Sequence, residues 1–180
     1  VSIFFDLRAV HGERQLVTRL SEALGECASG RHKGPFITAL ARQAAGYDVP
    51  LGFFRRFVLA GKGEHAETLE IKASGLMPLT DLVRVRALEA GITVPGTQAR
   101  LAALRDAGRL SDSDVDRLSG AHRLLAGLRV SLHADQVRRG EEPHNHLDPH
   151  SISHAERAAL RDAFLVIREA QKGLSLDFPA

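Results

Sequence analysis

Residues 111–139 read SDSDVDRLSGAHRLLAGLRVSLHADQVRR and form the longest stretch of the chain with one continuous helical pattern. It opens on a serine and two aspartates, which suit the N-terminal end of a helix and its dipole. Gly140 follows the last residue and marks the end of the helix. Apolar side chains recur along it at the spacing of one helical face: Val115, Leu118, Leu125, Leu128 and Leu132. The stretch therefore predicts one long amphipathic helix that buries this face against other elements.

Outward from this stretch, the same spacing predicts further helices joined by short loops. Ser153 and Glu156 form the capping-box pattern that begins the last of them, and Thr97 is a predicted N-cap. The expected helices cover residues 12–28, 35–45, 78–90, 98–107 and 154–172. Such a chain is mainly α, and the short loops favour an antiparallel helical bundle.

Strands are expected only in small pieces. Residues 1–5 (VSIFF) predict a short N-terminal strand, which needs a sheet to pair with. Because the rest of the chain offers few strands, we expect that sheet to lie upstream. Apolar residues at 57–59 and 69–71 flank a polar stretch, which is compatible with one small hairpin.

Composition and charge exclude several classes of protein. Apolar residues make up 44% and charged residues 26%, which is typical of an ordered globular domain. The 24 basic and 22 acidic residues are interleaved, so no basic block predicts a nucleic-acid partner. No apolar run approaches the ~18 residues of a membrane span, and we expect a cytoplasmic location. The single cysteine, Cys27, excludes an intrachain disulfide and is expected to be a small buried residue.

Asp6 is an unusual residue for the end of a predicted strand, because its neighbours Phe5 and Leu7 are apolar. A buried carboxylate needs a partner. One interpretation is a ligand for Mg²⁺ at a sheet edge, where the ion positions the phosphates of a nucleotide. The other is an ion pair with Arg8 or a turn at the strand's end. The residues alone leave both open.

Residues 4–12, Phe4-Phe5-Asp6-Leu7-Arg8-Ala9-Val10-His11-Gly12, resemble a strand of bacterial nucleotidyltransferases. Those enzymes include the ones that uridylylate or adenylylate nitrogen-control proteins. The rest of the chain resembles the helical domain that follows a nucleotidyltransferase domain in bacterial signalling proteins. Such proteins often carry cyclic-nucleotide-binding and CBS modules upstream. Three stretches carry this second resemblance: PLGFFRRF at 50–57, LEIKASGLMPL at 69–79 and NHLDP at 145–149.

The resemblance gives Asp6 a catalytic role as the third carboxylate of a metal triad. The first two carboxylates of that triad lie on upstream strands, and no matching pattern occurs in the five residues before Asp6. One aspartate cannot hold the ions of two-metal phosphoryl chemistry. We therefore expect Mg²⁺ in the full-length protein, and neither a cofactor nor activity in this chain alone. Residues 1–11 are then the last strand of the nucleotidyltransferase domain, and residues 12–180 the helical substrate-binding domain.

The resemblance also identifies cationic residues for nucleotide or substrate binding, beginning with Arg8. Residues 72–80 are similar to a lysine- and glycine-containing segment of the regulatory-protein transferases, but Pro78 and Thr80 stand where acidic residues occur there. Lys72 is retained and either meets a phosphate as a point charge or is a solvated lysine.

Two further arginines are candidates for the same role. Arg55 and Arg56 are adjacent, so at most one of them points into a pocket, where it could take a triphosphate bidentately. A surface ion pair is the alternative for both. Arg84 and Arg86 are expected to form surface ion pairs.

Four histidines in and beside one loop could indicate a zinc site, but their spacing does not support one. Pro149 and the Ser153 cap interrupt any common helical face, and we predict no stoichiometric zinc. The histidines concerned are His144, His146, His150 and His154. On the long helix, His122, Arg129 and His133 form a polar seam. It either lines an internal cleft or, as we favour, consists of hydrogen-bonded or snorkelling side chains at the edge of the apolar stripe.

Two functions follow from these observations. The first is a substrate-binding or lid domain of a nucleotidyltransferase related to protein-PII uridylyltransferases. Its expected partners are the upstream domain, a nucleoside triphosphate and a regulatory protein as acceptor, and a homo-oligomer is compatible with the apolar helix faces. The alternative is a non-catalytic helical interaction domain that transmits signals from upstream sensory modules.

Overall fold

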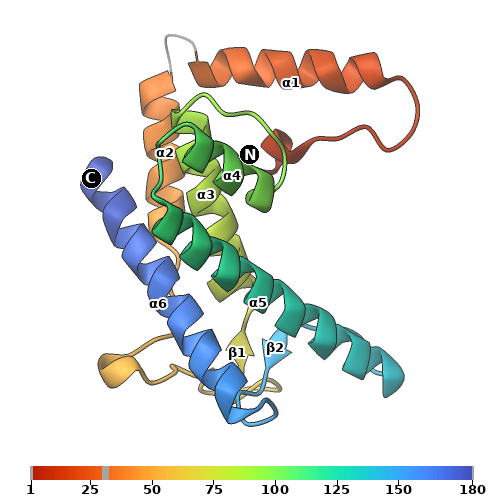
Figure 1. Ribbon diagram of the computed structural model, residues 1–180. Helices are drawn as coiled ribbons and strands as arrows, with labels where there is room; N and C mark the ends of the chain where they lie inside the picture. Colours follow the sequence, from red (N-terminus) through yellow and green to blue (C-terminus); the bar gives the residue numbers. More distant parts are fainter. Residues whose placement is uncertain (1, 30–32, 180) are drawn as a thin grey trace.

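The computed structural model describes residues 2–29 and 33–179 of the chain. Within these ranges it is mainly helical, as predicted, with one small two-stranded sheet (Figure 1). The α-helices are α1 (Arg14–Ser29), α2 (Lys33–Ala45), α3 (Met77–Glu89), α4 (Thr97–Asp106), α5 (Asp112–Arg138) and α6 (His154–Asp177). The shorter elements are the 3₁₀-helices η1 (Ser2–Asp6) and η2 (Phe53–Arg55), the π-helix η3 (Lys72–Leu76), and the strands β1 (Leu69–Glu70) and β2 (His146–Leu147).

The predicted N-terminal strand is wrong, because Ser2–Asp6 forms η1 instead. Among the described residues the only sheet is β1–β2, so an extended N-terminal segment finds no ladder to join. The segment is held by other contacts. The Phe5 ring lies 5.9 Å from that of Phe36, and the Phe5 carbonyl accepts a hydrogen bond of 2.7 Å from Arg100. Phe5 is thus half-buried in this short 3₁₀-helix, whereas Phe4 is 49% exposed.

The predicted helices are confirmed, and local capping explains where two of them begin. The Ser111 hydroxyl accepts from the backbone N–H of Asp114 at the start of α5. Ser153 and Glu156 form the complete capping box of α6. The prediction for Thr97 is off by one residue. Gly96, with φ 88, is the N-cap of α4, and Thr97 is buried as its first residue.

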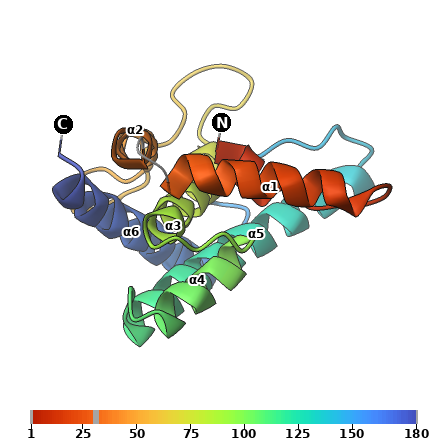
Figure 2. The same cartoon turned by 90° about the horizontal axis from the view of Figure 1, so that it is seen from above.

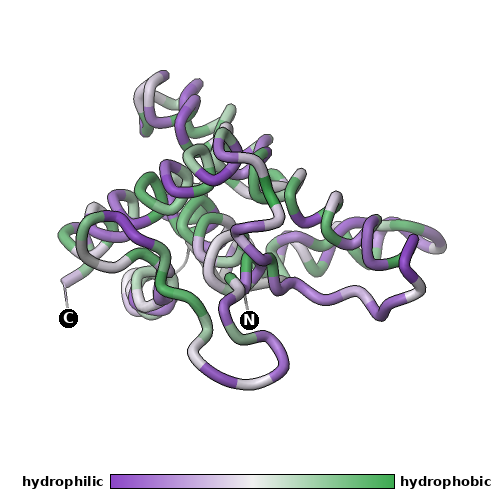
Figure 3. Tube along the Cα trace, turned by 90° about the horizontal axis from the view of Figure 1, so that it is seen from below, coloured by the Kyte–Doolittle hydropathy of each residue, from purple (hydrophilic) through white to green (hydrophobic). Residues whose placement is uncertain are grey.

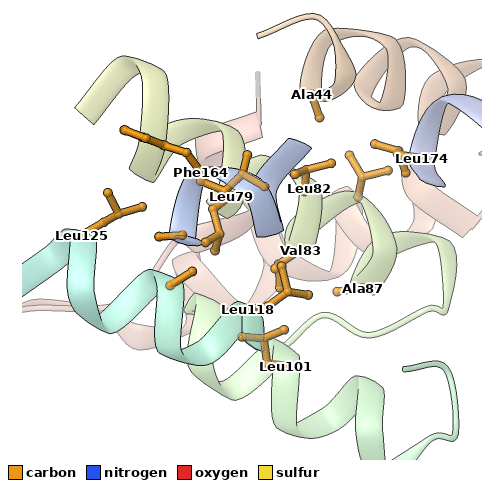
Figure 4. Packing of buried hydrophobic residues seen from close by; sticks show 14 of the residues in the cluster. Ala44, Leu79, Leu82, Val83, Ala87, Leu101, Leu118, Leu125, Phe164 and Leu174 are labelled. Atoms are coloured by element: carbon orange, nitrogen blue, oxygen red, sulfur yellow. The ribbon is translucent and has the colours of Figure 1, made fainter. Parts of the chain in front are cut away.

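Helix α3 is the centre of the bundle. It contacts α2, α4, α5 and α6, and it is buried on most of its surface (Figures 1 and 2). Figure 4 shows its core residues between those of the neighbouring helices, with Leu79 beside Phe164 of α6 and Val83 beside Leu118 of α5. Along the helices of the bundle, hydrophobic and hydrophilic residues alternate (Figure 3). No helix in the described part of the chain combines the length and apolarity that crossing a bilayer requires.

The small sheet pairs segments that are far apart in the sequence. β1 and β2 run antiparallel, with Leu69 opposite Leu147 and Glu70 opposite His146. The predicted hairpin is therefore wrong in its partner, since β1 does not pair with residues 57–59. Phe57 instead forms an isolated bridge with Leu51. Core burial decides this pairing, because Leu69 and Leu147 are each almost fully buried.

Helix α1 lies apart from the bundle and contacts α2 and η1 (Figures 1 and 2). Its apolar residues Leu16 and Leu20 are 62% and 46% exposed. The Cys27 side chain, which we expected to be buried, lies outside the described residues. The boundary that we placed after residue 11 stays a prediction.

Candidate functional site

A cavity of about 420 Å³ opens between α2, η3, α3 and α5. Its volume falls in the range of small-molecule sites in proteins. Three apolar residues, Leu76, Met77 and Ala126, form one part of its wall. The remaining lining is polar or charged: Gln43, Tyr47, Lys72, Thr80, Asp81, Arg84, His122 and Arg129. The cavity thus offers both a surface for an apolar group and several groups that bind anions.

The π-helix η3 carries Lys72 to the mouth of this cavity. Single π-turns are rare and are frequently found at functional sites. Gly75 allows the turn to pack closely on the core. A Cβ at this position would lie 3.1 Å from a Leu125 methyl and 3.2 Å from the Phe164 ring. The exposed Lys72 is therefore mounted on a tightly packed turn, and of the predicted binding residues it is the one that lines the cavity.

The polar seam of α5 forms another wall. His122, Ala126, Arg129 and His133 follow one another at three- and four-residue spacing, which places them on one helical face. The first three line the cavity. Both interpretations of this seam hold in part, because His122 and Arg129 line the cavity and each is also hydrogen-bonded to a neighbouring side chain. Here the sequence contained the signal, but the seam also flanks the apolar stripe, so spacing alone could not decide.

The hydrogen bonds of His122 fix its tautomer. Gln98 accepts from the Ser119 hydroxyl with its amide oxygen, so its amide nitrogen is the donor that lies 3.1 Å from His122 Nδ1. Nδ1 is therefore an acceptor, and the proton of the neutral ring is on Nε2. Burial, followed by the charge of Arg123, lowers the pKa of His122 below its ordinary value. At neutral pH this ring can donate one hydrogen bond to a ligand.

The one carboxylate of the cavity is neutralised within the protein. Asp81 accepts from the Tyr47 hydroxyl at 2.8 Å and from Arg84. Burial, and then the hydrogen bond to Asp81, raises the pKa of Tyr47, so the phenol stays protonated. The Arg84 side chain is only 5% exposed, and its Nε is buried without a hydrogen-bond partner among the described residues. Among the described residues that line the cavity, Lys72 and Arg129 are the cations left for a ligand.

Asp6 is engaged by two buried arginines. Its carboxylate lies 2.5 Å from Arg84 Nη2 and 2.7 Å from Arg100 Nη1, and it accepts from the backbone N–H of Gly96 at 3.2 Å. Burial alone would raise the pKa of Asp6. The hydrogen bonds from Arg84 and Gly96 and the two guanidinium charges outweigh burial and lower the pKa below its ordinary value. The ion-pair interpretation is correct in kind, but the partners are Arg84 and Arg100 rather than Arg8.

In the described part of the chain, the surroundings of Asp6 do not form a magnesium site. Within residues 2–29 and 33–179 no three His, Cys, Asp or Glu side chains are grouped so that they could hold a metal ion. Both oxygens of Asp6 already face guanidinium nitrogens. That Asp6 is catalytic and binds Mg²⁺ together with carboxylates from another domain stays a prediction.

The other predicted binding residues lie outside the cavity. Arg8 is exposed on the segment between η1 and α1. Arg55, at the end of η2, and Arg56 are exposed on a segment that packs on α6, where Phe57 meets Phe164 edge to face at 6.1 Å. Their roles stay predictions, and the cavity does not bring them together with Lys72.

Of the two arginines that we expected in surface ion pairs, Arg86 meets that expectation. It pairs with Glu89 and Asp177 and keeps about a quarter of its side chain exposed. Arg84 is also ion-paired, but it is buried at the junction of η1, α2 and α3. Sequence spacing gives no signal for this burial, because the partner Asp6 lies 78 residues away.

Three histidines form a second, separate cavity of about 620 Å³. The ring of His65 stacks on that of His146, with centroids 3.8 Å apart and an angle of 14° between the planes. The ring of His144 lies 4.6 Å from His65. Because imidazole lone pairs lie in the ring plane, two stacked rings cannot direct both lone pairs at one ion. That the protein binds no stoichiometric zinc stays a prediction.

From the stacked histidines we expect the free energy of unfolding to fall in mild acid. Burial, then the charge of His65, lowers the pKa of His146, with Glu70 acting in the opposite sense. The unfolded chain therefore binds protons more readily than the folded one as the pH falls through about 6.5. The free energy of unfolding, measured by urea titration, should be lower at pH 5.5 than at pH 7.5. His146→Phe keeps a stacking ring but cannot titrate, and it should reduce this difference. An unchanged difference in that variant would show that the stack is not responsible.

Comparison with known proteins gives one match. The sequence model of a protein family described as "Putative nucleotidyltransferase substrate binding domain" matches residues 34–178 of the 180-residue chain. Among curated proteins and among solved structures, no match was found. The matched region contains every residue that lines the first cavity, whereas Asp6 and α1 precede it.

Proposed function

This chain belongs to the family of putative nucleotidyltransferase substrate-binding domains, and we propose that it holds the nucleotide substrate in the cavity between α2, η3, α3 and α5. The observation that carries this proposal is that Lys72 and Arg129 both line a cavity in which Asp81, the one carboxylate among the described lining residues, is already paired. Two cations without a competing anion favour a phosphate-bearing ligand.

The rest of the cavity supports a nucleotide rather than an inorganic anion. Leu76, Met77 and Ala126 provide an apolar wall against which a base or ribose can pack. His122 can donate from Nε2 to an acceptor atom of the ligand. The triphosphate would lie at Lys72 and Arg129, and the base toward the apolar wall.

The chemistry itself would take place in a catalytic domain of the same polypeptide. In this proposal Mg²⁺ accompanies the nucleotide and is held mainly by carboxylates of that domain. A relation to protein-PII uridylyltransferases, with a regulatory protein as acceptor, is the proposed context. We also propose that the whole protein is a cytoplasmic signalling protein with cyclic-nucleotide-binding or CBS modules. Assembly into a homo-oligomer is a further part of this proposal.

A second candidate function is a non-catalytic interaction domain, and one observation favours it. The apolar residues Leu16 and Leu20 of α1 are exposed on a helix that lies apart from the bundle. In that case α1 would transmit the state of neighbouring modules. The cavity would then bind no nucleotide, which separates the two candidates.

Calorimetric titration of this chain with ATP and with UTP, each with and without Mg²⁺, tests the proposal. We expect one nucleotide to bind, and Lys72→Ala to weaken its binding about tenfold, since a charge-assisted contact at an exposed site contributes about 1.4 kcal/mol. Lys62→Ala is the matched control, because Lys62 is also exposed but does not line the cavity. No binding of either nucleotide, or an equal effect of both substitutions, would overturn the proposal.

A further inference from the structure

We infer that Asn145 is a positioning residue of the nucleotide cavity, which orients Arg129 through its side chain and fixes the start of η3 through its backbone. This inference rests on the function proposed above. Asn145 does not line the cavity itself, so it would act only through the two cations that do.

The side chain of Asn145 connects two residues of the polar seam on α5. Its Oδ1 accepts a hydrogen bond of 2.7 Å from Arg129 Nε and lies 3.2 Å from His133 Nε2. Since an amide oxygen only accepts, His133 must donate from Nε2. A guanidinium is planar, so a bond at Nε restrains the orientation of both terminal nitrogens. Arg129 can then present those nitrogens to a phosphate with little loss of conformational freedom.

The backbone of Asn145 acts on the second cation. Its carbonyl accepts from the N–H of Ile71 at 3.1 Å, and Ile71 is fully buried directly before Lys72. The neighbouring pair Glu70 and His146 continues this contact as the β1–β2 ladder. One residue thus ties together Lys72 from η3 and Arg129 from α5, which are separated by more than fifty positions in the sequence.

The two neighbours of Asn145 in the sequence do not contact the nucleotide cavity but line the second cavity. His144 and His146 line the second cavity, as expected where successive side chains in an extended segment alternate in direction. The backbone N–H of His144 is held by the side chain of Gln136, at 3.0 Å. Gln136 is 1% exposed and anchors the same segment without lining the nucleotide cavity. It therefore provides a control that is purely structural.

A double-mutant cycle on nucleotide affinity tests this inference. The variants are Asn145→Leu, Arg129→Met and the double variant, titrated with whichever of ATP and UTP the wild type binds more tightly. We expect Asn145→Leu to weaken binding about fivefold, and to add no further loss when Arg129 is already methionine. Gln136→Leu should lower the melting temperature without changing the affinity. Additive losses in the cycle, or an equal loss of affinity in Gln136→Leu, would overturn the inference.

A measurement on the wild-type protein covers the case in which Asn145→Leu does not fold. Hydrogen exchange of the arginine Nε–H groups can be followed by NMR, and we expect slower exchange at Arg129 than at the exposed Arg55. Equal rates would show that the Asn145 hydrogen bond is not maintained and would overturn the inference. If the wild type binds neither nucleotide, the proposed function fails and this inference fails with it. If the wild type binds but the cycle is additive, this inference alone fails.

Discussion

Phe164→Ala is expected to lower the free energy of unfolding by about 3–5 kcal/mol, the usual cost of truncating a fully buried phenylalanine. Phe164 has no exposed surface, and it supports the turn that carries Lys72. One of its ring carbons would lie 3.2 Å from a Cβ at Gly75, and its ring packs edge to face with that of Phe57, with the centroids 6.1 Å apart. Alanine would leave a cavity directly beneath η3, and the tightly packed neighbours cannot close it completely.

Urea unfolding at pH 7.5 measures this effect, and Leu176→Ala is its matched control. Leu176 lies on the same helix α6 but is 75% exposed, so its truncation should change the free energy of unfolding by less than about 0.5 kcal/mol. A loss in Phe164→Ala no larger than that in Leu176→Ala would contradict the core packing described here.

Asp6→Asn is expected to cost about 2–3 kcal/mol of folding free energy. The amide keeps the shape of the side chain but leaves Arg100, which is 1% exposed, without its counter-charge. Removing one member of a buried pair costs about 3–5 kcal/mol. The expected value is lower here because Asp6 is 33% exposed and Arg84 keeps Asp81 as a partner. Thermal and urea unfolding of the two proteins measure the difference.

The control for Asp6→Asn is Asp177→Asn. Asp177 also pairs with an arginine, Arg86, but it is 54% exposed, and such pairs contribute at most about 1 kcal/mol. The pH dependence distinguishes the two sites further. Because the pKa of Asp6 is lowered, its contribution is complete above its ordinary value of 3.8 and is lost as the pH falls through the folded pKa. If Asp6→Asn proves as stable as the wild type, Asp6 is free for another role, and the metal-ligand prediction gains support.

The parts of the fold that sequence could predict are those fixed by local interactions. The ends of α5 and α6 depend on Ser111 and Ser153, each bonded to a residue three positions away. The N-terminal segment was predicted incorrectly because its conformation depends on Arg84 and Arg100, which lie more than seventy positions away. The pairing of Leu69 with Leu147 is equally non-local.

The residues of the candidate site also fall into two groups, those that sequence could predict and those that it could not. Lys72 was identified from a motif, and the seam of His122 and Arg129 from helical spacing, and both line the cavity. The burial of Arg84 and Arg100 could not be predicted from the sequence, since helical spacing does not distinguish a buried arginine from an exposed one. Asn145 lay in a recognised stretch, but only its contacts with Arg129 and Ile71 indicate what it could do.

NMR mapping of the bound nucleotide would show directly whether it occupies the cavity between α2, η3, α3 and α5. Backbone amide shifts of the labelled chain would be followed during titration with ATP or UTP. We expect the largest changes at Lys72, Met77, His122, Ala126 and Arg129, around the cavity between α2, η3, α3 and α5. The histidine cavity around His65 and His146 should change little. Shifts concentrated at the histidine cavity, or no saturable shifts at all, would contradict the assignment of this domain's nucleotide site.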